Sequence, residues 1–335
     1  MRLFDELKIK DMHLKNRIVL APMCMVSAEE GMANDFHIIH YATRAMGQMG
    51  LIIVEATAVA ENGMISNKDL GLWCDEQIKP LSWIVKRVKA FGGKVGIQLN
   101  HAGRRAKDKE NMVSASSIAY GNFNKPKELT IPEIKEIVEA FKTSAKRAYI
   151  AGFDFLEIHA AHGYLINSFL SPLTNKRADI YGGSLENRSR LLYEIIEAIR
   201  EEWPIEKPLG IRISYTDYHK DGLDVKDYIE ILNNIKPNLV DVIDVSSGGI
   251  LKEKVEEYPA YQLRGAKMLK THTNYFIIAG GMINDAKLAD DIIKLNDADL
   301  IYFGRLALKD PYFPLKFARD LKIEISWLRQ YERAK

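Results

Sequence analysis

The strongest constraint on the fold of this chain is a repeated alternation between short apolar runs and longer amphipathic segments. Eight runs rich in β-branched residues are each followed by a polar or glycine-containing loop. Near-continuous apolar strands of this kind are typical of a parallel sheet that is covered on its faces. The runs span Arg17–Ala21, Leu51–Ala56, Lys94–Leu99, Asp154–His159, Leu209–Ser214, Val240–Val245, Tyr275–Ala279 and Asp299–Phe303.

The segments between the runs have helical periodicity. Pro132–Ala151 has one apolar face, and Thr130 with Glu133 predicts a capped start for this helix. Eight strand–helix pairs without a break in composition predict an α/β fold, one (β/α)8 TIM barrel with eight parallel strands over residues 1–335. A doubly wound open sheet is disfavoured because no GxGxxG motif follows the first run.

Composition narrows the function classes. The 335 residues are 47% hydrophobic and 27% charged, and the net charge of +2 comes from scattered side chains, so we expect neither a nucleic-acid face nor a membrane-bound role. The N-terminus lacks the apolar stretch of a signal peptide, so we expect a cytoplasmic protein. The two cysteines, Cys24 and Cys74, lie outside any metal-ligand pattern, so neither a metal site nor a disulfide framework is expected.

In a barrel of this type, function gathers at the carboxyl ends of the strands. Polar residues or glycines stand at the end of every run, which is more than packing requires. Two long connections, 102–124 and 246–261, are candidate lids over the active site. The residues at these ends are Pro22, Met23 and Cys24; Glu55 and Ala56; Gln98, Asn100 and His101; His159, His162 and Tyr164; Arg212; Ser246, Ser247 and Gly248; Gly280, Gly281 and Met282; and Gly304 and Arg305.

Three of these groups suggest chemistry. The glycines after the last two runs, with Arg305, suit a phosphate group, because glycine lets backbone N–H groups approach it. His159 and His162 could chelate a metal, or they could act as neutral donors to a substrate oxygen with Tyr164 as proton donor. The first role would need a carboxylate, and Glu157 is expected to point away from the histidines.

Two further residues at the strand ends also need an interpretation. Arg212 could stabilise negative charge on a bound ring system, with Gln98 also facing the barrel mouth, or it could be a structural partner of Glu55 or Asp244. Cys24 is flanked by apolar residues, so composition alone favours a buried and inert thiol.

Longer segments around these residues resemble the Old Yellow Enzyme family of flavin oxidoreductases, in particular its bacterial branch of xenobiotic reductases and thermophilic-like ene-reductases. The resemblance runs from Leu14–Met25 (LKNRIVLAPMCM) to Gln330–Arg333 (QYER), which is essentially the whole chain. Its most specific segments are GLIIVEATAV, GIQLNHAGRR, AGFDFLEIHAAHGYLINSFLSPLTNKRADIYGGSLENRSR and YFGRLALKDP.

This resemblance implies an FMN-dependent ene-reductase that NADPH or NADH reduces in a ping-pong cycle. It implies that His159 and His162 bind the carbonyl or nitro oxygen of an activated alkene, that flavin N5 delivers hydride to the β-carbon and that Tyr164 delivers the proton to the α-carbon. Cys24 would lie near N5 and tune its potential, in place of the inert role that composition suggests. The implied FMN contacts are Pro22, Met23, Cys24, Ala56, Gln98, Arg212, Gly281, Met282, Gly304 and Arg305.

Two positions bear on the substrate side and on assembly. The branch commonly has a tyrosine where this chain has Val26, so the substrate pocket should be more apolar at that wall. The family's C-terminal arginine, matched by Arg333, reaches a neighbouring subunit's active site, which implies a homodimer or homotetramer with the tail (about 325–335) at the interface.

Two alternatives remain open from the sequence. One is a dehydrogenase of the same family that works in the opposite direction, such as an amine demethylase, although the HAAHGY segment favours the reductase. The other is a barrel without redox chemistry: a metal-dependent lyase or aldolase, or a flavin-binding sensor.

Overall fold

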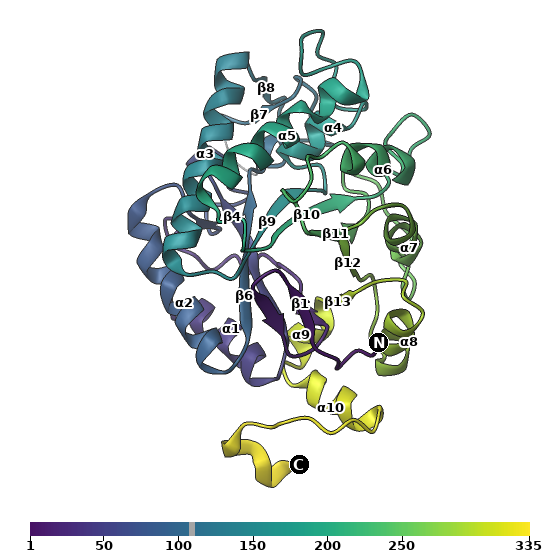
Figure 1. Ribbon diagram of the computed structural model, residues 1–335. Coiled ribbons are helices and arrows are strands. Elements are labelled where there is room, and N and C mark those ends of the chain that lie inside the picture. The colour runs from purple at the N-terminus through teal and green to yellow at the C-terminus, as the bar shows by residue number, and fades with distance from the viewer. Residues whose placement is uncertain (107–110) are drawn as a thin grey trace.

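Eight parallel strands close into a barrel in the computed structural model, which describes residues 1–106 and 111–335 (Figure 1). Neighbouring strands follow chain order, and the last strand pairs back to the first. This architecture confirms the predicted (β/α)8 barrel and all eight predicted strands. The strands are β3 (Ile18–Leu20), β4 (Leu51–Ala58), β6 (Lys94–Asn100), β9 (Phe155–Ala160), β10 (Leu209–Ser214), β11 (Val242–Ser246), β12 (Phe276–Ala279) and β13 (Leu300–Phe303).

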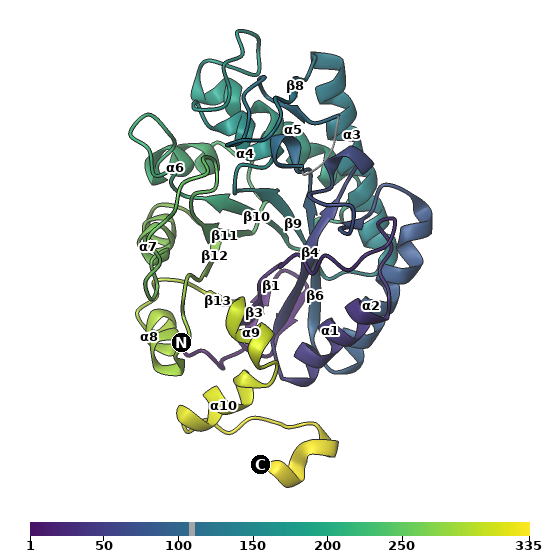
Figure 2. The ribbon, with the colours of Figure 1, turned by 180° about the vertical axis from the view of Figure 1, so that it is seen from behind.

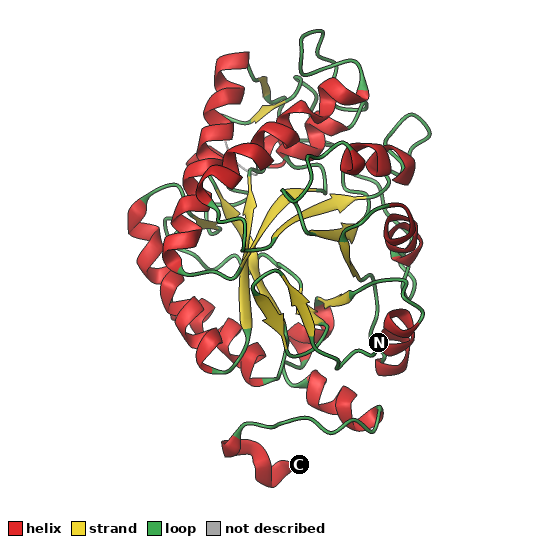
Figure 3. Ribbon diagram, viewed as in Figure 1, coloured by secondary structure: helices red, strands yellow, loops and turns green. Residues whose placement is uncertain are grey.

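A ring of helices covers the outside of the barrel (Figure 3). Helix α3 starts as predicted, since Thr130 and Glu133 form a reciprocal capping box in which the Glu133 carboxylate accepts from the Thr130 N–H at 2.8 Å. The helices are α1 (Asp35–Met46), α2 (Ile78–Ala90), α3 (Ile131–Ala151), α4 (Leu165–Leu170), α5 (Leu185–Glu202), α6 (Val225–Asn233), α7 (Leu263–His272), α8 (Ala286–Lys294), α9 (Arg305–Lys309) and α10 (Phe313–Asp320).

Short elements complete the chain, and the sequence patterns did not predict them. They are the strands β1 (Leu7–Ile9), β2 (Met12–Leu14), β5 (Leu70–Gly71), β7 (Val113–Ser114) and β8 (Lys127–Glu128), and the 3₁₀ turns η1 (Glu61–Gly63), η2 (Asp75–Gln77), η3 (Gly103–Arg105) and η4 (Arg329–Ala334). In the part of the chain that the structure describes, no helix is both long and apolar enough to cross a bilayer.

The β1–β2 hairpin closes the N-terminal end of the barrel (Figures 1 and 2). Its apolar side chains join one buried cluster with the lowest inward-facing residues of the barrel strands. Strands of three residues carry too little alternation to be recognised from sequence. The cluster consists of Ile9, Met12, Leu14, Val19, Leu51, Ile53, Phe155, Val242, Ile278 and Leu300.

Phe155 forms the upper end of this cluster in the barrel interior, and two glycines make room for its ring. A Cβ at Gly96 would lie 2.7 Å from Phe155 Cδ1, and a Cβ at Gly210 would lie 2.4 Å from Cζ. Both glycines stand on strands that flank β9, at inward-facing positions. The apolar part of the barrel therefore ends at Phe155, and the inward positions above it carry polar side chains.

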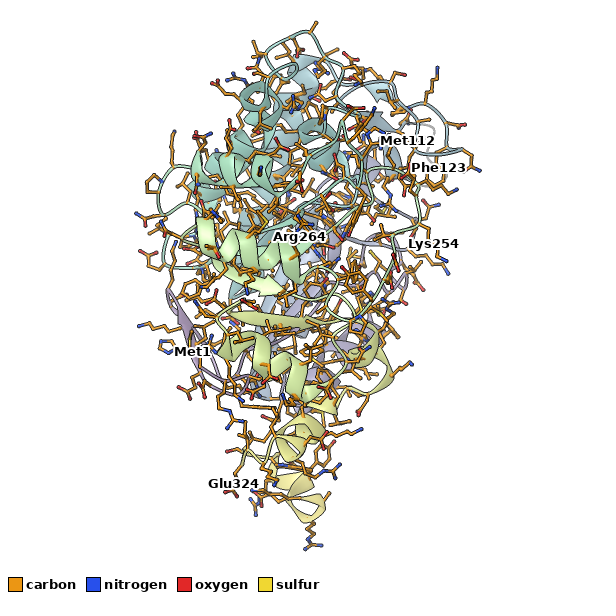
Figure 4. All side chains as sticks on the ribbon, turned by 90° about the vertical axis from the view of Figure 1, so that its right-hand side faces the viewer. Met1, Met112, Phe123, Lys254, Arg264 and Glu324 are labelled. Atoms are coloured by element: carbon orange, nitrogen blue, oxygen red, sulfur yellow. The ribbon has the colours of Figure 1, made fainter. Side chains whose placement is uncertain are left out.

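Long connections gather at the carboxyl ends of the strands. Viewed from the side, Met112, Phe123 and Lys254 lie at one edge of the molecule and Met1 at the opposite edge (Figure 4). The loops after β6 and β11 meet there, since Lys252 Nζ donates to Asn122 Oδ1 at 2.9 Å. These loops are the two predicted candidate lids; residues 107–110 of the first lie outside the described residues.

The C-terminal segment leaves the barrel beside α10 and projects away from it (Figure 1). The η4 turn has no buried residue, and the ring of its Tyr331 lies 5.8 Å, between centroids, from that of Tyr312, the N-cap residue of α10. Arg333 belongs to this projecting turn.

We expect Gly210→Ala to lower the free energy of unfolding by about 1–3 kcal/mol, because the added methyl group overpacks the Phe155 ring. Urea unfolding followed by circular dichroism measures this loss. In a Phe155→Leu background the same substitution should cost less, because the ring atoms that it meets are gone. An equal loss in both backgrounds would contradict this account of the packing.

Candidate active site

The end of β9 brings the three predicted residues His159, His162 and Tyr164 together. The His159 ring lies between the other two, with its centroid 5.1 Å from that of His162 and 4.8 Å from that of Tyr164, and both contacts are edge-to-face. His159 is the last inward-facing residue of β9, and Tyr164 is the N-cap residue of α4. The strand end and the following turn therefore place two imidazoles and a phenol around one point at the barrel mouth.

Both imidazoles are neutral. Burial lowers the pKa of His159 well below its usual value, and the charges of Arg212 and Arg105 add to this effect. Burial and the same two arginines lower the pKa of His162. A neutral imidazole has one N–H donor and one acceptor, so the position of each ring proton decides what the site can do.

Hydrogen bonds at the opposite nitrogens indicate where the two ring protons lie. The Ala161 N–H donates to His159 Nδ1 at 3.2 Å, so the ring proton of His159 is on Nε2. His162 Nε2 lies 2.6 Å from Ser246 Oγ, and Gln262 Nε2 donates to that same oxygen at 3.1 Å. Among the described residues, His162 Nε2 is the acceptor in contact with the Ser246 hydroxyl, so we infer that this hydroxyl donates to Nε2 and that the ring proton of His162 is on Nδ1.

The Gln262 amide is itself oriented, because its Oε1 accepts a hydrogen bond from the Tyr302 hydroxyl. Ser246 was predicted from the sequence as a strand-end residue, whereas Gln262 and Tyr302 were not predicted. Nothing in their spacing marks them, because they come from α7's start and from β13, and only barrel closure makes them neighbours.

His162 has a left-handed backbone, with a φ of 58°. This conformation is uncommon outside glycine, and three contacts hold it. The His162 N–H donates to Ser214 Oγ at 3.0 Å, and the His162 carbonyl accepts from Arg105. The next residue, Gly163, packs so closely on Gly249 that a Cβ would lie 2.3 Å from its carbonyl oxygen.

Arg105 also lies against Tyr164. The centre of its guanidinium is 5.0 Å from the Tyr164 ring centroid and 4.5 Å from that of Tyr120. Burial raises the pKa of Tyr164, so the phenol keeps its proton at neutral pH, while the charge of Arg105 opposes this shift and favours loss of the proton. Arg105 belongs to the GIQLNHAGRR segment, but no role for it was predicted from the sequence.

Arg212 is buried in the wall of the barrel below the histidines. Its Nε lies 3.3 Å from Asp244 Oδ2, and its guanidinium centre lies 5.2 Å from the Tyr302 ring centroid. Burial alone would lower its pKa, but the Asp244 carboxylate, together with smaller contributions from Tyr302 and Glu157, outweighs burial and raises it. Glu55 and Asp244 were the two structural partners of Arg212 considered from the sequence, and Asp244 is the one that lies beside it. This ion pair still allows Arg212 to face a ligand.

Gln98 and Glu157 lie beside this pair, and one prediction about them was wrong. Glu157 does not point away from His159: the two residues are two apart on β9, so both face the barrel interior, and Glu157 is fully buried there. The Gln98 amide donates to Glu157 Oε1 at 2.7 Å. Ala56 pairs with Gln98 in the strand register.

The loop after β3 carries Pro22, Met23, Cys24 and Val26. The buried Glu55 holds it, because its Oε2 accepts from the Met25 N–H at 2.7 Å and its Oε1 accepts from the Tyr41 hydroxyl at 3.0 Å. Glu55 is therefore a support for this loop and not a partner of Arg212. Burial raises the pKa of Glu55 to about 7.

Cys24 and Val26, both in this loop, differ in exposure. Burial raises the pKa of the Cys24 thiol, and the charges of Asp69 and Glu55 add to the shift, so the thiol is protonated. Val26 has a left-handed φ of 53°, which is unusual for a β-branched residue, and the residue is 48% exposed. This loop therefore carries an exposed apolar residue with a strained backbone at position 26. A larger side chain at this position would extend further from the loop.

The ends of β12 and β13 bring Gly281, Met282, Gly304 and Arg305 together. Arg305 Nη2 lies 2.9 Å from Met282 Sδ and donates to Glu257 Oε2 at 2.7 Å. Gly281 has a φ of 91°, and a Cβ at Gly304 would lie 3.3 Å from Met23 Sδ. An exposed guanidinium thus stands beside two glycines that leave the backbone open.

These features fit a flavin nucleotide. The open backbone at Gly281 and Gly304 with Arg305 suits a phosphate, and the buried Arg212 offers a permanent positive charge to a ring that gains negative charge. Buried side-chain atoms without a hydrogen-bond partner among the described residues cluster at this end of the barrel: Asn100 Oδ1, His101 Nε2, Glu157 Oε2, Arg212 Nε and both Asp244 carboxylate oxygens.

Comparisons with known proteins point the same way. Residues 2–324 match the model of the NADH:flavin oxidoreductase / NADH oxidase family. The chain is 49% identical to an NADPH dehydrogenase of Clostridium acetobutylicum, over 100% of this chain and 99% of that one. It is 48% identical to an NADPH dehydrogenase of Geobacillus sp., over 99% of this chain and 98% of that one.

Solved structures agree with these relatives. Morphinone reductase in complex with tetrahydroNAD superposes with a TM-score of 0.83 at 27% identity, over 98% of this chain and 92% of that one. A 2-naphthoyl-CoA reductase in complex with 2-naphthoyl-CoA gives a TM-score of 0.90 at 25% identity over 95% of this chain, which spans only 52% of that reductase.

We predict that the rings of His159 and His162 stay neutral from pH 8 down to pH 6, with the proton on Nε2 in His159 and on Nδ1 in His162. Nitrogen-15 NMR of histidine-labelled protein distinguishes the two neutral forms and the cation, and a His159→Gln and a His162→Gln variant assign the signals. A doubly protonated ring at either position at pH 6 would contradict the electrostatic account.

Proposed function

The chain belongs to the NADH:flavin oxidoreductase / NADH oxidase family, the Old Yellow Enzyme family, and we propose that it reduces C=C bonds conjugated to a carbonyl or nitro group. The family makes it an FMN-dependent oxidoreductase with a nicotinamide reductant. The observation that carries the choice of substrate is the convergence of two neutral imidazole donors and one phenol at the barrel mouth. The same family assignment favours redox chemistry over a lyase or a metal enzyme.

The proposed FMN site uses residues from six strand ends. When bound, FMN accepts hydride from the nicotinamide and supplies hydride to the alkene. Arg212, which pairs with Asp244, would neutralise negative charge on the ring, Gln98 would donate a hydrogen bond to the ring, and Arg305 would hold the phosphate. The remaining proposed contacts are Pro22, Met23, Cys24, Ala56, Gly281, Met282 and Gly304.

His159 and His162 bind the substrate oxygen. The Nε2–H of His159 and the Nδ1–H of His162 are the donors that their other hydrogen bonds leave available. Two donors to one oxygen withdraw electrons from the conjugated alkene and make its β-carbon a better hydride acceptor. They stabilise the enolate more than the ketone, which lowers the barrier.

Tyr164 supplies the proton to the α-carbon. Its phenol is protonated at neutral pH because burial raises its pKa, so it can act as a general acid. The Arg105 guanidinium, 5.0 Å from the ring centroid, stabilises the phenolate that this transfer leaves. Arg105 also holds the carbonyl of His162, so one side chain supports both the acid and one oxygen donor.

Further parts of the proposal concern the substrate wall and the assembly. Val26 gives the substrate pocket an apolar wall, which leaves room for a bulky apolar substituent near the alkene. Arg333 lies on the exposed η4 turn, where it can reach the barrel mouth of a neighbouring copy. The enzyme would accordingly work as a homodimer or homotetramer in the cytoplasm, with NADPH or NADH as reductant.

Anaerobic stopped-flow mixing tests the function directly. We expect NADPH to bleach the yellow absorbance of the FMN-loaded protein and 2-cyclohexenone to restore it. In the restoring step, His159→Ala and Tyr164→Phe should each be slower by roughly 10²-fold, since each removes an oxygen donor or the proton donor. Bleaching by NADPH should change far less in both variants.

Tyr193→Phe, which removes a hydroxyl on α5 remote from the mouth, is the matched control and should change neither step. Failure of every activated alkene and nitroalkene to restore the absorbance would rule out the proposed reaction. Equal slowing of both steps in His159→Ala would mean that the residue acts on binding or folding and not on the substrate oxygen.

A further inference from the structure

A buried layer of four polar side chains lies between Phe155 and the catalytic histidines. Gln98, Glu157, Arg212 and Asp244 come from four adjacent strands, β6, β9, β10 and β11, and all face the barrel interior. The exposed fraction is 0% for Glu157 and 1% for Asp244. No step in the proposed reaction uses either carboxyl group directly.

The two carboxyl groups are in contact with each other. A side-chain oxygen of Glu157 lies within hydrogen-bonding reach of Asp244. Glu157 Oε1 accepts from the Gln98 amide at 2.7 Å, and Asp244 Oδ2 lies 3.3 Å from Arg212 Nε. Among the described residues, nothing donates a hydrogen bond to Glu157 Oε2 or to either oxygen of Asp244.

Two ionised carboxylates in this position would make an unfavourable contact. Each oxygen is an acceptor, so two ionised groups have no proton to place between them, and their charges repel in a site without water. One arginine balances only one of the two charges. A single proton removes both problems, because it turns the contact of two acceptors into a hydrogen bond and leaves the layer with one positive and one negative charge.

The surroundings decide which group holds that proton. Asp244 is adjacent to Arg212, which favours its ionised form, whereas the other partner of Glu157 is the neutral amide of Gln98. We infer that Glu157 is a neutral carboxylic acid that donates a hydrogen bond to ionised Asp244, so that Gln98, Glu157, Asp244 and Arg212 form one continuous chain. Burial and the charge of Asp244 raise the pKa of Glu157 well above its usual value, in agreement with this assignment.

This chain makes Glu157 and Asp244 positioning residues for the flavin site. Asp244 orients Arg212 from its Nε side, and Glu157 orients the Gln98 amide by accepting from its nitrogen. Because Glu157 holds the proton, the charges of Arg212 and Asp244 cancel and the net charge of the layer is zero. With Glu157 ionised, the layer beside the flavin would carry a net negative charge. The inference rests on the proposed roles of Gln98 and Arg212, but the protonation state can be measured whether or not the protein reduces alkenes.

Reduction potentials of the FMN-loaded protein give the first test. Glu157→Gln replaces a neutral acid with a neutral amide that still donates to Asp244. It should therefore change the ratio of oxidised to reduced flavin at a given potential by less than tenfold, which is about 30 mV for a two-electron couple. Asp244→Asn is the matched comparison: it removes the charge that balances Arg212 and should raise the potential by more than this. A positive shift in Glu157→Gln as large as that in Asp244→Asn would overturn the inference, because it would mean that Glu157 is ionised.

Infrared spectroscopy of the unmutated holoenzyme gives the second test and depends on no variant. At pH 9, where Glu55 with its pKa of about 7 is ionised, a carboxylic-acid C=O band should remain, and carbon-13 labelling of glutamate should shift it. The band should vanish in Glu157→Gln. Absence of the band, or a band that shifts with labelled aspartate and not with glutamate, would overturn the assignment of the proton to Glu157.

Discussion

The positive charge of Arg212, buried in the barrel wall with Asp244 as its ion-pair partner, is the constraint on which the rest of the site depends. A guanidinium cannot lose its proton to escape burial, so the structure must surround it with compensating groups. Asp244 supplies the compensating charge, Tyr302 covers the guanidinium with its ring, and Glu157 joins the cluster through Asp244. Gly280 permits this arrangement, since a Cβ there would lie 2.2 Å from Tyr302 Cζ.

Burial is the main reason that the two histidines are neutral, and the same charge adds to it. Burial disfavours an imidazolium at His159 and His162, and Arg212 and Arg105 act in the same direction. The two histidines are therefore neutral donors. The contacts of Ala161 and Ser246 with one nitrogen of each ring place the ring proton on the other nitrogen. Neutral donors suit an uncharged ketone or nitro group that gains negative charge in the reaction, because they bind it more tightly as that charge develops. Arg105 then links the donors to Tyr164, so one charge supports the acid as well.

Much of this could be predicted from sequence, and the exceptions share a physical cause. The eight strands and the capped helix α3 follow from local periodicity and capping, and the structure has them where they were expected. The residues His159, His162 and Tyr164 are close in the chain, so their convergence at one strand end was also predictable. The roles of Gln262, Tyr302 and Arg105 were not, because each is defined by a neighbour on another strand or loop. The error at Glu157 came from its direction on the strand, since residues two apart share a face, and the three-residue strands of the β1–β2 hairpin are too short to show a pattern.

The central claim is that two neutral histidines polarise the oxygen of an activated alkene, and the vibration of that bond reports it most directly. In the oxidised, FMN-loaded protein, the C=O stretch of bound 2-cyclohexenone should lie at a lower frequency than in water. Replacing either His159 or His162 with alanine should remove a substantial part of that shift. A bound carbonyl that vibrates as it does in water, or a shift that survives both substitutions, would contradict the account.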